Sequence, residues 1–259
     1  MHMADALLSP GTGVLMWVAS CAVMSVAARC VQRADDRLMP LMGMLGAFVF
    51  AAQMVNFSIP GTGSSGHLGG GLLLAILLGP HAAFVVVASV LTVQALFFAD
   101  GGLLALGANM FNLGVLPCYL AYPLVYRPLA GRSPAPRRVA FAALLAAVVA
   151  LQLGALAVVL QTVASGISSL PASAFLGLML PIHLAIGVVE GLATATLVGF
   201  LRRARPELLD LSASGMAPGR RQLLLPLSLA AALTGGVLSW FASPPVSYTH
   251  LTLPTTILV

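Results

Sequence analysis

Charged residues are scarce in this chain, and lysine is absent altogether. Only 7% of the 259 residues are charged, whereas 59% are hydrophobic, and the mean hydropathy is +1.02. A soluble globular domain carries about 25% charged residues, and a disordered chain combines low hydrophobicity with high net charge. Both classes are excluded. At roughly 20 apolar residues per crossing, we expect an all-α polytopic membrane protein embedded in the lipid bilayer.

Cysteine is also rare, and the phosphate-binding motif G-x-x-x-x-G-K-[ST] is missing. Cys21, Cys30 and Cys118 lie in or beside apolar stretches without CxxC spacing, which indicates packing rather than disulfides or a zinc site. Without a phosphate loop, any ATP-driven activity requires ATPases on partner chains. No positive side chain precedes Arg29, so we expect no secretory signal and a retained N-terminus.

Apolar stretches and arginines together predict the topology. The stretches cover residues 12–28, 40–57, 68–79, 82–99, 103–126, 139–164, 175–201 and 222–241. The twelve arginines give a net charge of +5, but they lie between apolar stretches, so we expect no nucleic-acid partner. The stretch 68–79 is short for a full crossing, so it could be a half-helix or a tilted partner of the stretch 82–99. If it and 82–99 each cross, all arginines fall on one side, which the positive-inside rule makes cytoplasmic.

This topology places His2 and His67 on the same outer face, with His67 in a glycine-rich loop, residues 58–71. The amine of Met1, the deprotonated backbone nitrogen of His2 and Nδ1 of His2 can form fused chelate rings with three coplanar nitrogens. His67 is the best candidate for a fourth. Square-planar nitrogen ligation favours Ni(II) or Cu(II) over Zn(II). From spacing alone, a histidine at position two can also be incidental.

Six motifs resemble the CbiM/NikM family and follow the family's order: MHMAD (1–5), SSGHLGGG (64–71), AILLGP (75–80), QALFFADGG (94–102), LGAN (106–109) and HLAIGVVEG (183–191). The members are substrate-binding S components of energy-coupling factor transporters for cobalt and nickel. The resemblance covers about residues 1–205. It implies seven helices, one N-terminal helix added to a six-helix core, and a metal site made of Met1, His2 and His67. His81 replaces an expected aromatic residue and receives no site role.

The resemblance also implies how the protein works and what it assembles with. The expected partners are a transmembrane coupling subunit and two ATPase subunits, with a small accessory membrane subunit as a further candidate. The chain would capture Co(II) or Ni(II) at the outer face of a bacterial-type inner membrane, without a permanently bound cofactor and without enzymatic activity. Cobalt would serve cobalamin synthesis and nickel would supply metalloenzymes; the sequence leaves that choice open.

The C-terminal part stands apart from this family-like region. The stretch 222–241 resembles the start of an appended C-terminal module, so we expect residues 206–245 to form a cytoplasmic linker and one extra transmembrane helix. From Val246 onward, VSYTHLTLPT resembles the translation of a sequencing adapter. We therefore expect residues 246–259 to be an artefact, which leaves the native continuation, and whether the module replaces an accessory subunit, undefined.

Other polar residues are candidates for supporting the ligands or gating the site: Ser64, Ser65, Asp100, Asn109, His183 and Glu190. Ionisable groups at membrane depth are functional candidates. His183 and Glu190 lie seven apart on one helix and share a face, but they could equally bond to each other or to backbone and fix helix packing. The membrane amides could line the pocket or form interhelical hydrogen bonds, and packing is the favoured role for most of them: Gln94, Asn109, Asn112, Gln152 and Gln161.

A rival function comes from a short pattern in the glycine-rich loop. Residues 63–66, Gly-Ser-Ser-Gly, fit the G-x-S-G pattern of rhomboid intramembrane serine proteases, and His183 could serve as the base. This reading predicts that Ser65 is essential and His2 is dispensable. The metal hypothesis predicts the reverse.

Overall fold

The computed structural model describes residues 2–32, 38–131, 135–168 and 170–205. Met1 and the segments 206–245 and 246–259 therefore lie outside the described residues, and the expected C-terminal helix is among them. The helices are α1 (Pro10–Val31), α2 (Leu38–Gln53), α3 (Gly71–Leu78), α4 (Pro80–Phe97), α5 (Leu106–Met110), η2 (Phe111–Tyr126), α6 (Arg127–Ala130), α7 (Pro136–Ser165) and α8 (Ala172–Ala204), with the short 3₁₀ turn η1 (Asp5–Leu7). The all-α class is confirmed.

The helices correspond to the first seven apolar stretches, because α5, the π-wound η2 and α6 follow one another without a break. Within the described residues, four helices, α1, α4, α7 and α8, are long and apolar enough to cross a membrane, and α2 is a shorter apolar helix. The eight residues of α3 rise only about 12 Å, against a hydrocarbon core of about 30 Å, and all of them are buried. The third stretch is thus a half-length helix, one of the two forms expected for it.

Local sequence sets several helix ends. Pro10 stands at the first position of α1, and the hydroxyl of Ser9 accepts a hydrogen bond from the Thr12 N–H, which satisfies one of the free donors at that end. A leucine-rich run breaks between α3 and α4 at Gly79, whose φ is +79°, and Pro80 begins α4. Gly166 ends α7 in the left-handed conformation, as is common for helix C-termini.

Helices α7 and α8 pack most closely. Cβ atoms added to Gly187 and Gly191, one turn apart on α8, would lie 3.0 and 2.7 Å from backbone Cα atoms of α7. Small residues four apart allow such contact between membrane helices. By contrast, only 11% of the most apolar 18-residue segment of α1 is buried. Helix α1 packs against α4, α5 and η2, as expected for a helix added to the outside of a core.

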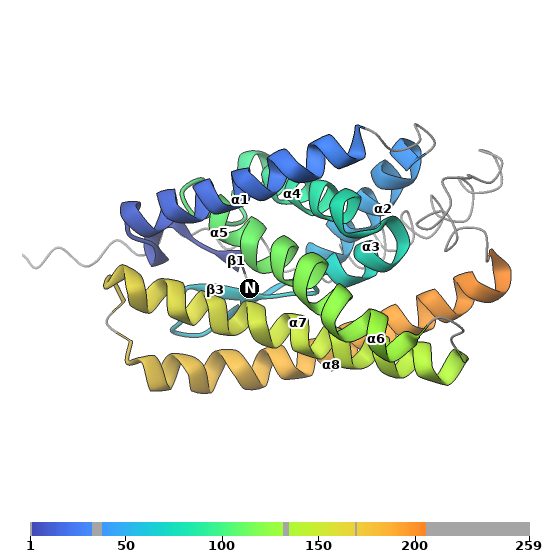
Figure 1. Cartoon of the computed structure of the whole chain (residues 1–259). Coiled ribbons are helices and arrows are strands. Elements are labelled where there is room, and N and C mark those ends of the chain that lie inside the picture. Colours follow the sequence, from blue (N-terminus) through green and yellow to red (C-terminus); the bar gives the residue numbers. More distant parts are fainter. Residues whose placement is uncertain (1, 33–37, 132–134, 169, 206–259) are drawn as a thin grey trace, which may run out of the picture.

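The arginines gather at one end of the molecule. Figure 1 shows the C-terminal ends of α1 and α8, the end of α6 and the start of α7 on the same side. These ends carry the arginines that the structure describes: Arg29, Arg127, Arg137, Arg138, Arg202, Arg203 and Arg205. The arrangement agrees with the one-sided arginine distribution predicted from the sequence.

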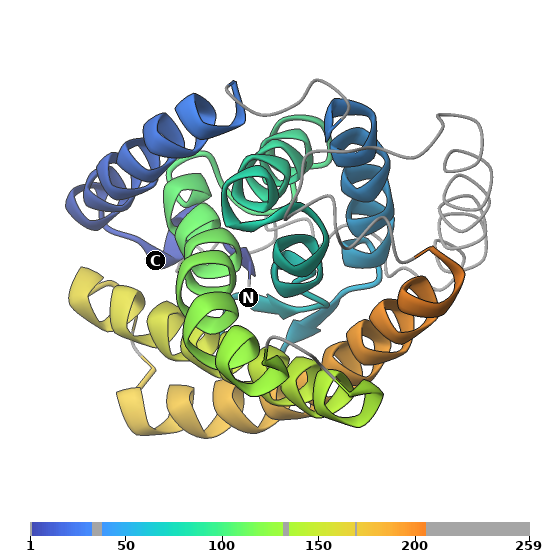
Figure 2. The same ribbon diagram turned by 45° about the vertical axis from the view of Figure 1, so that its right-hand side comes forward.

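A small sheet among the helices was not predicted. Strand β1 (His2–Met3) pairs antiparallel with β3 (Ser64–Gly66), and β2 (Phe57–Ile59) pairs with the other edge of β3. Figure 2 shows the sheet enclosed by the surrounding helices. The register sets His2 opposite Ser65 and Met3 opposite Ser64. The glycine-rich loop therefore lies in the interior of the protein, and β1 is an edge strand of the sheet.

Candidate metal centre

The N-terminal strand is held by side chains from distant parts of the chain. The Met3 N–H donates to Oδ1 of Asn109 over 2.8 Å, and Nδ2 of Asn109 donates to the Met3 carbonyl over 3.1 Å. On the other side, the Ser64 hydroxyl donates to the His2 carbonyl over 2.9 Å. The carboxamide of Asn109 thus occupies the place of a neighbouring strand. Met3 is fixed in position, and His2 with it.

A second amide pair lies beneath this strand. The carboxamides of Asn112 and Gln161 donate to each other over 2.9 Å in both directions. Asn112 Nδ2 also lies 3.7 Å from the Met3 sulfur, and Met3 is completely buried. These contacts are consistent with the packing role favoured for the two amides. Asn112 packs directly against the N-terminal strand, at the Met3 side chain.

The rings of His2 and His67 face each other in the interior. Their centroids are 4.6 Å apart, their planes are inclined by 42°, and the two residues are only 1% and 2% exposed. Nδ1 of His67 lies 2.7 Å from the Leu68 carbonyl, and because a carbonyl only accepts, Nδ1 carries the hydrogen. Nε2 of His67 and Nδ1 of His2 are buried without a hydrogen-bond partner. Two ring nitrogens are therefore available to a ligand.

Asp100 lies beside the His2 ring. Its Oδ1 is 3.2 Å from Nδ1 of His2, within ion-pair distance but without hydrogen-bond geometry. The turn that presents it is tight: Ala99 has φ +51° and Gly101 has φ +80°, and a Cβ on Gly101 would lie 2.9 Å from Nδ2 of Asn109. A left-handed non-glycine residue is uncommon, so the surrounding structure imposes this conformation on Ala99.

The electrostatics keep Asp100 ionised and His67 neutral. Burial alone would raise the pKa of Asp100, but the neighbouring His2 ring outweighs that effect and lowers it to about 2. Burial lowers the pKa of His67 well below its usual value, and the His2 ring lowers it further. A neutral His67 with its hydrogen on Nδ1 presents a lone pair on Nε2, as a metal ligand requires.

Glu190 and His183 bond to backbone and not to each other. Glu190 Oε2 and Oε1 accept from the N–H groups of Gly69 (2.6 Å) and Gly70 (3.1 Å), just beyond His67. Nδ1 of His183 lies 2.8 Å from the Met179 carbonyl, and its Nε2 is buried without a hydrogen-bond partner. Of the partners considered for these two side chains, the structure shows backbone groups, and those of Glu190 lie in the glycine-rich loop.

The described side chains alone do not make a metal site. Among the described residues, no group of three or more His, Cys, Asp or Glu side chains could hold a metal ion. Binding at the two histidines therefore needs backbone or N-terminal nitrogens, which is the donor set expected from the sequence.

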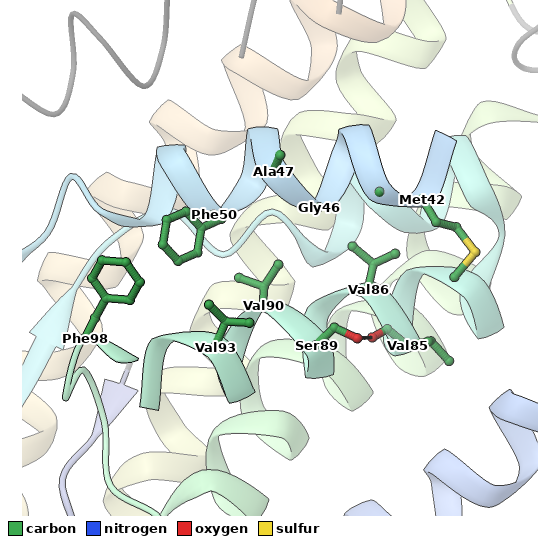
Figure 3. Close-up of a pocket in the computed structure, with 11 residues that line it drawn as sticks. Met42, Gly46, Ala47, Phe50, Val85, Val86, Ser89, Val90, Val93 and Phe98 are labelled. Atoms are coloured by element: carbon green, nitrogen blue, oxygen red, sulfur yellow. Dashed lines mark hydrogen bonds between the residues drawn. The ribbon is translucent and has the colours of Figure 1, made fainter. Parts of the chain in front are cut away.

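An apolar groove lies elsewhere. It has a volume of about 530 Å³ between α2 and α4, and Figure 3 shows mostly apolar side chains around it, among them Met42, Phe50, Val86 and Phe98. Its polar side chain, Ser89, is already bonded to the Val85 carbonyl over 2.8 Å. The groove offers no donor set for a cation. His81 is likewise bonded to the Tyr119 hydroxyl over 2.9 Å, in keeping with the absence of a site role for it.

Comparisons with known proteins identify cobalt and nickel transport proteins as relatives of this chain. The family described as "Cobalt uptake substrate-specific transmembrane region" (CbiM) matches residues 2–208. A fused nickel transport protein, NikMN, of Rhodobacter capsulatus is 34% identical, over 90% of this chain and 74% of that protein. A cobalt transport protein, CbiM, of Sorangium cellulosum is 32% identical, over 85% of this chain and 99% of that protein.

A solved structure agrees with these sequence relatives. The crystal structure of a truncated transition metal transporter superposes with a TM-score of 0.68 at 32% identity, covering 78% of this chain and 99% of that one. The relatives are metal transport proteins, and the apolar helices make this chain a multi-pass membrane protein. With the family match over residues 2–208, the chain belongs to the CbiM family of substrate-specific transmembrane components of cobalt and nickel transport.

Proposed function

We propose that this chain captures Co(II) or Ni(II) through four nitrogens: the Met1 amine, the backbone nitrogen of His2, Nδ1 of His2 and Nε2 of His67. The observation that carries the proposal is the pair of facing, buried histidines whose ring nitrogens have no hydrogen-bond partner: Nε2 of His67, and Nδ1 of His2 beside the Asp100 carboxylate. A buried polar atom without a partner is costly, and a cation would satisfy both. The N-terminal chelate supplies the donors that side chains do not.

Charge balance supports a divalent cargo. A metal with charge +2, the deprotonated His2 amide and ionised Asp100 sum to zero when both imidazoles and the amine are neutral. A buried net charge is strongly unfavourable. Asp100, 8% exposed and beside Nδ1 of His2, is therefore assigned to neutralise the cargo. Ser64 and Asn109 hold the strand that carries the chelate.

Two other candidate residues receive weaker assignments. Ser65 pairs in register with His2, so we assign it to the loop framework. His183 lies on α8, whose Met179 and Phe175 belong to the same buried cluster as Met3. We assign His183 to the wall behind the N-terminal strand, with its free Nε2 as an acceptor for a group of that strand.

Transport would follow from assembly. We propose that the ion enters from outside across an inner membrane, with the N-terminus outside and the arginine-bearing ends in the cytoplasm. A transmembrane coupling subunit and two ATPase chains would drive release inward, and the segment 206–245 would begin an appended module. The family description and the one-sided arginines support this reading. No resident cofactor and no covalent chemistry are needed.

The protease alternative has little support. A serine protease needs a nucleophile bonded to its base, whereas Nε2 of His183 has no hydrogen-bond partner and is therefore not bonded to Ser65. The relatives named above are metal transport proteins.

The proposal is tested by isothermal titration with Co(II) and Ni(II) on purified protein whose native start is verified by mass spectrometry. One variant carries an extra alanine before Met1, a second is His67→Ala, and the control is His81→Ala, which removes a histidine bonded to Tyr119. We expect the first two to lose binding and the control to retain it. Unchanged affinity in the extended variant would overturn the chelate.

A further inference from the structure

One peptide beside the candidate centre is held from two sides by buried side chains. Glu190 of α8 accepts hydrogen bonds from the Gly69 and Gly70 N–H groups, and Nε2 of Gln53, the last residue of α2, donates to the Gly69 carbonyl over 2.7 Å. Gln94 of α4 in turn donates to Oε1 of Gln53 over 3.0 Å. Glu190, Gln53, Gly69 and Gly70 are here called the Gly69 clamp.

The clamp is fitted to glycine and to a pair of accepting oxygens. Gly70 has φ +73°, and a Cβ there would lie 2.8 Å from the Val49 side chain; a Cβ on Gly69 would lie 3.3 Å from Oε2 of Glu190. Gly70 caps the N-terminus of α3, where N–H groups lack helical partners and negative charge is favoured. Hydrogen bonds to a charged acceptor are stronger than neutral ones.

The clamp controls the position of His67 through a short, rigid segment. Only Leu68 separates His67 from Gly69, and its carbonyl accepts from Nδ1 of His67. The ring is therefore oriented by the same backbone that Glu190 and Gln53 hold. A shift of the Gly69 peptide would move Nε2 away from Nδ1 of His2.

There is space on one side of the clamp for such a shift. A cavity of about 490 Å³ between α2 and α8 is lined by Leu68, Gly70, Glu190 and Thr194 among others. The loop and the carboxylate border an open volume, whereas the two histidines are enclosed. Movement of α8 relative to α2 would be transmitted to the loop directly, because the clamp joins both helices to one peptide.

We infer that Glu190 and Gln53 are positioning residues that hold His67 against His2, and that opening of the Gly69 clamp toward this cavity releases the metal. This inference rests on the proposed function for the cargo. It adds the part of the fold that sets the lifetime of the bound ion.

The test compares Glu190→Gln and Gln53→Leu with the control Gln152→Leu. Glu190→Gln keeps the size but removes the charge and one of the two acceptors. Gln53→Leu opens the other side of the same peptide without touching a charge. Gln152→Leu removes an interhelical bond, from Nε2 to the Leu180 carbonyl over 2.9 Å, that does not involve the loop.

Two measurements are made in nanodiscs. Amide hydrogen exchange of the segment 67–71 without metal reports the clamp, and Ni(II) dissociation into excess chelator reports its consequence. We expect each clamp variant to accelerate both about tenfold, equivalent to about 1.4 kcal/mol, with the absorption spectrum of bound Ni(II) unchanged. The control should leave both rates at the wild-type value.

The outcomes separate the two proposals. Wild-type protein that binds no Ni(II) would refute the proposed function, while the exchange rates would still report whether Glu190 holds the loop. Release rates within twofold of wild type in both clamp variants, with wild-type binding intact, would overturn the positioning role alone. Equal acceleration by Gln152→Leu would also overturn it, because general destabilisation would then explain the effect.

Discussion

Replacing Asp100 by asparagine should weaken metal binding through the loss of one charge at nearly constant shape. The nearest carboxylate oxygen lies 3.2 Å from Nδ1 of His2. A metal on that nitrogen would lie about 2 Å beyond it, hence at most about 5 Å from the carboxylate. The metal and the deprotonated amide carry a combined charge of +1.

The magnitude follows from Coulomb's law. Two unit charges about 5 Å apart at an effective dielectric constant of about 20 attract by about 3 kcal/mol, which corresponds to roughly a hundredfold in affinity. Asp100 is 8% exposed, so water screens the interaction only weakly.

The assay is a competition titration of Ni(II) and Co(II) against a fluorescent chelator at pH 7.5. Asp5→Asn is the matched control: it removes a charge from the same N-terminal segment, and its amide oxygen can still accept from the Ala105 N–H, now bonded to Oδ1 of Asp5 over 2.8 Å. We expect roughly a hundredfold weaker binding for Asp100→Asn and less than threefold for Asp5→Asn. Wild-type affinity in Asp100→Asn would refute charge neutralisation as the role of this residue.

Three further predictions concern the strand, the helix packing and acid stability. Asn109→Leu removes both hydrogen bonds to Met3 and leaves two buried backbone groups unpaired, at about 1–3 kcal/mol each, so calorimetry should show at least tenfold weaker metal binding and a lower unfolding temperature. Gly191→Ala should lower the melting temperature in detergent without changing the spectrum of bound Ni(II), because its Cβ would lie 2.7 Å from the backbone of α7; Gly177→Ala, where nothing lies within 4 Å, should do neither. The pKa of Asp100, lowered to about 2 from about 3.9 in the unfolded chain, implies stability that is complete above about pH 5 and is lost as the pH falls toward 2. The difference in denaturation midpoint between wild type and Asp100→Asn should therefore vanish near pH 2, and a constant difference would contradict this linkage.

The helices could be predicted because they coincide with apolar stretches that end at glycine, proline or arginine residues. The break at Gly79-Pro80 and the short third stretch were visible in the sequence, and the structure confirms α3 as a half-length helix. The sheet could not be predicted in the same way. Its strands are two or three residues long, and the pairing of β1 with β3 joins segments about 60 residues apart.

The ligand residues of the candidate site could be predicted from local chemistry and from the family resemblance. The residues that hold them could not, because their hydrogen-bond partners are distant in the sequence. A histidine at position two can chelate with its own backbone, so His2 stood out from the sequence, and the family resemblance added His67. Gln53 is an ordinary polar residue at a helix end, and only the fold shows that it bonds to Gly69. Asn112 and Gln161 were assigned to packing, but their partner, the N-terminal strand, could not be read from their spacing.

The enclosed sheet also explains why the ring nitrogens are left for the metal. Backbone away from water must find its hydrogen bonds within the protein, and β1 has only one neighbouring strand. Asn109 supplies the missing edge at Met3, and Glu190 and Gln53 do the same at Gly69. Because these side chains satisfy the backbone, Nδ1 of His2 and Nε2 of His67 stay without a hydrogen-bond partner. A variant that offered either nitrogen an internal partner should therefore fold well and bind metal poorly.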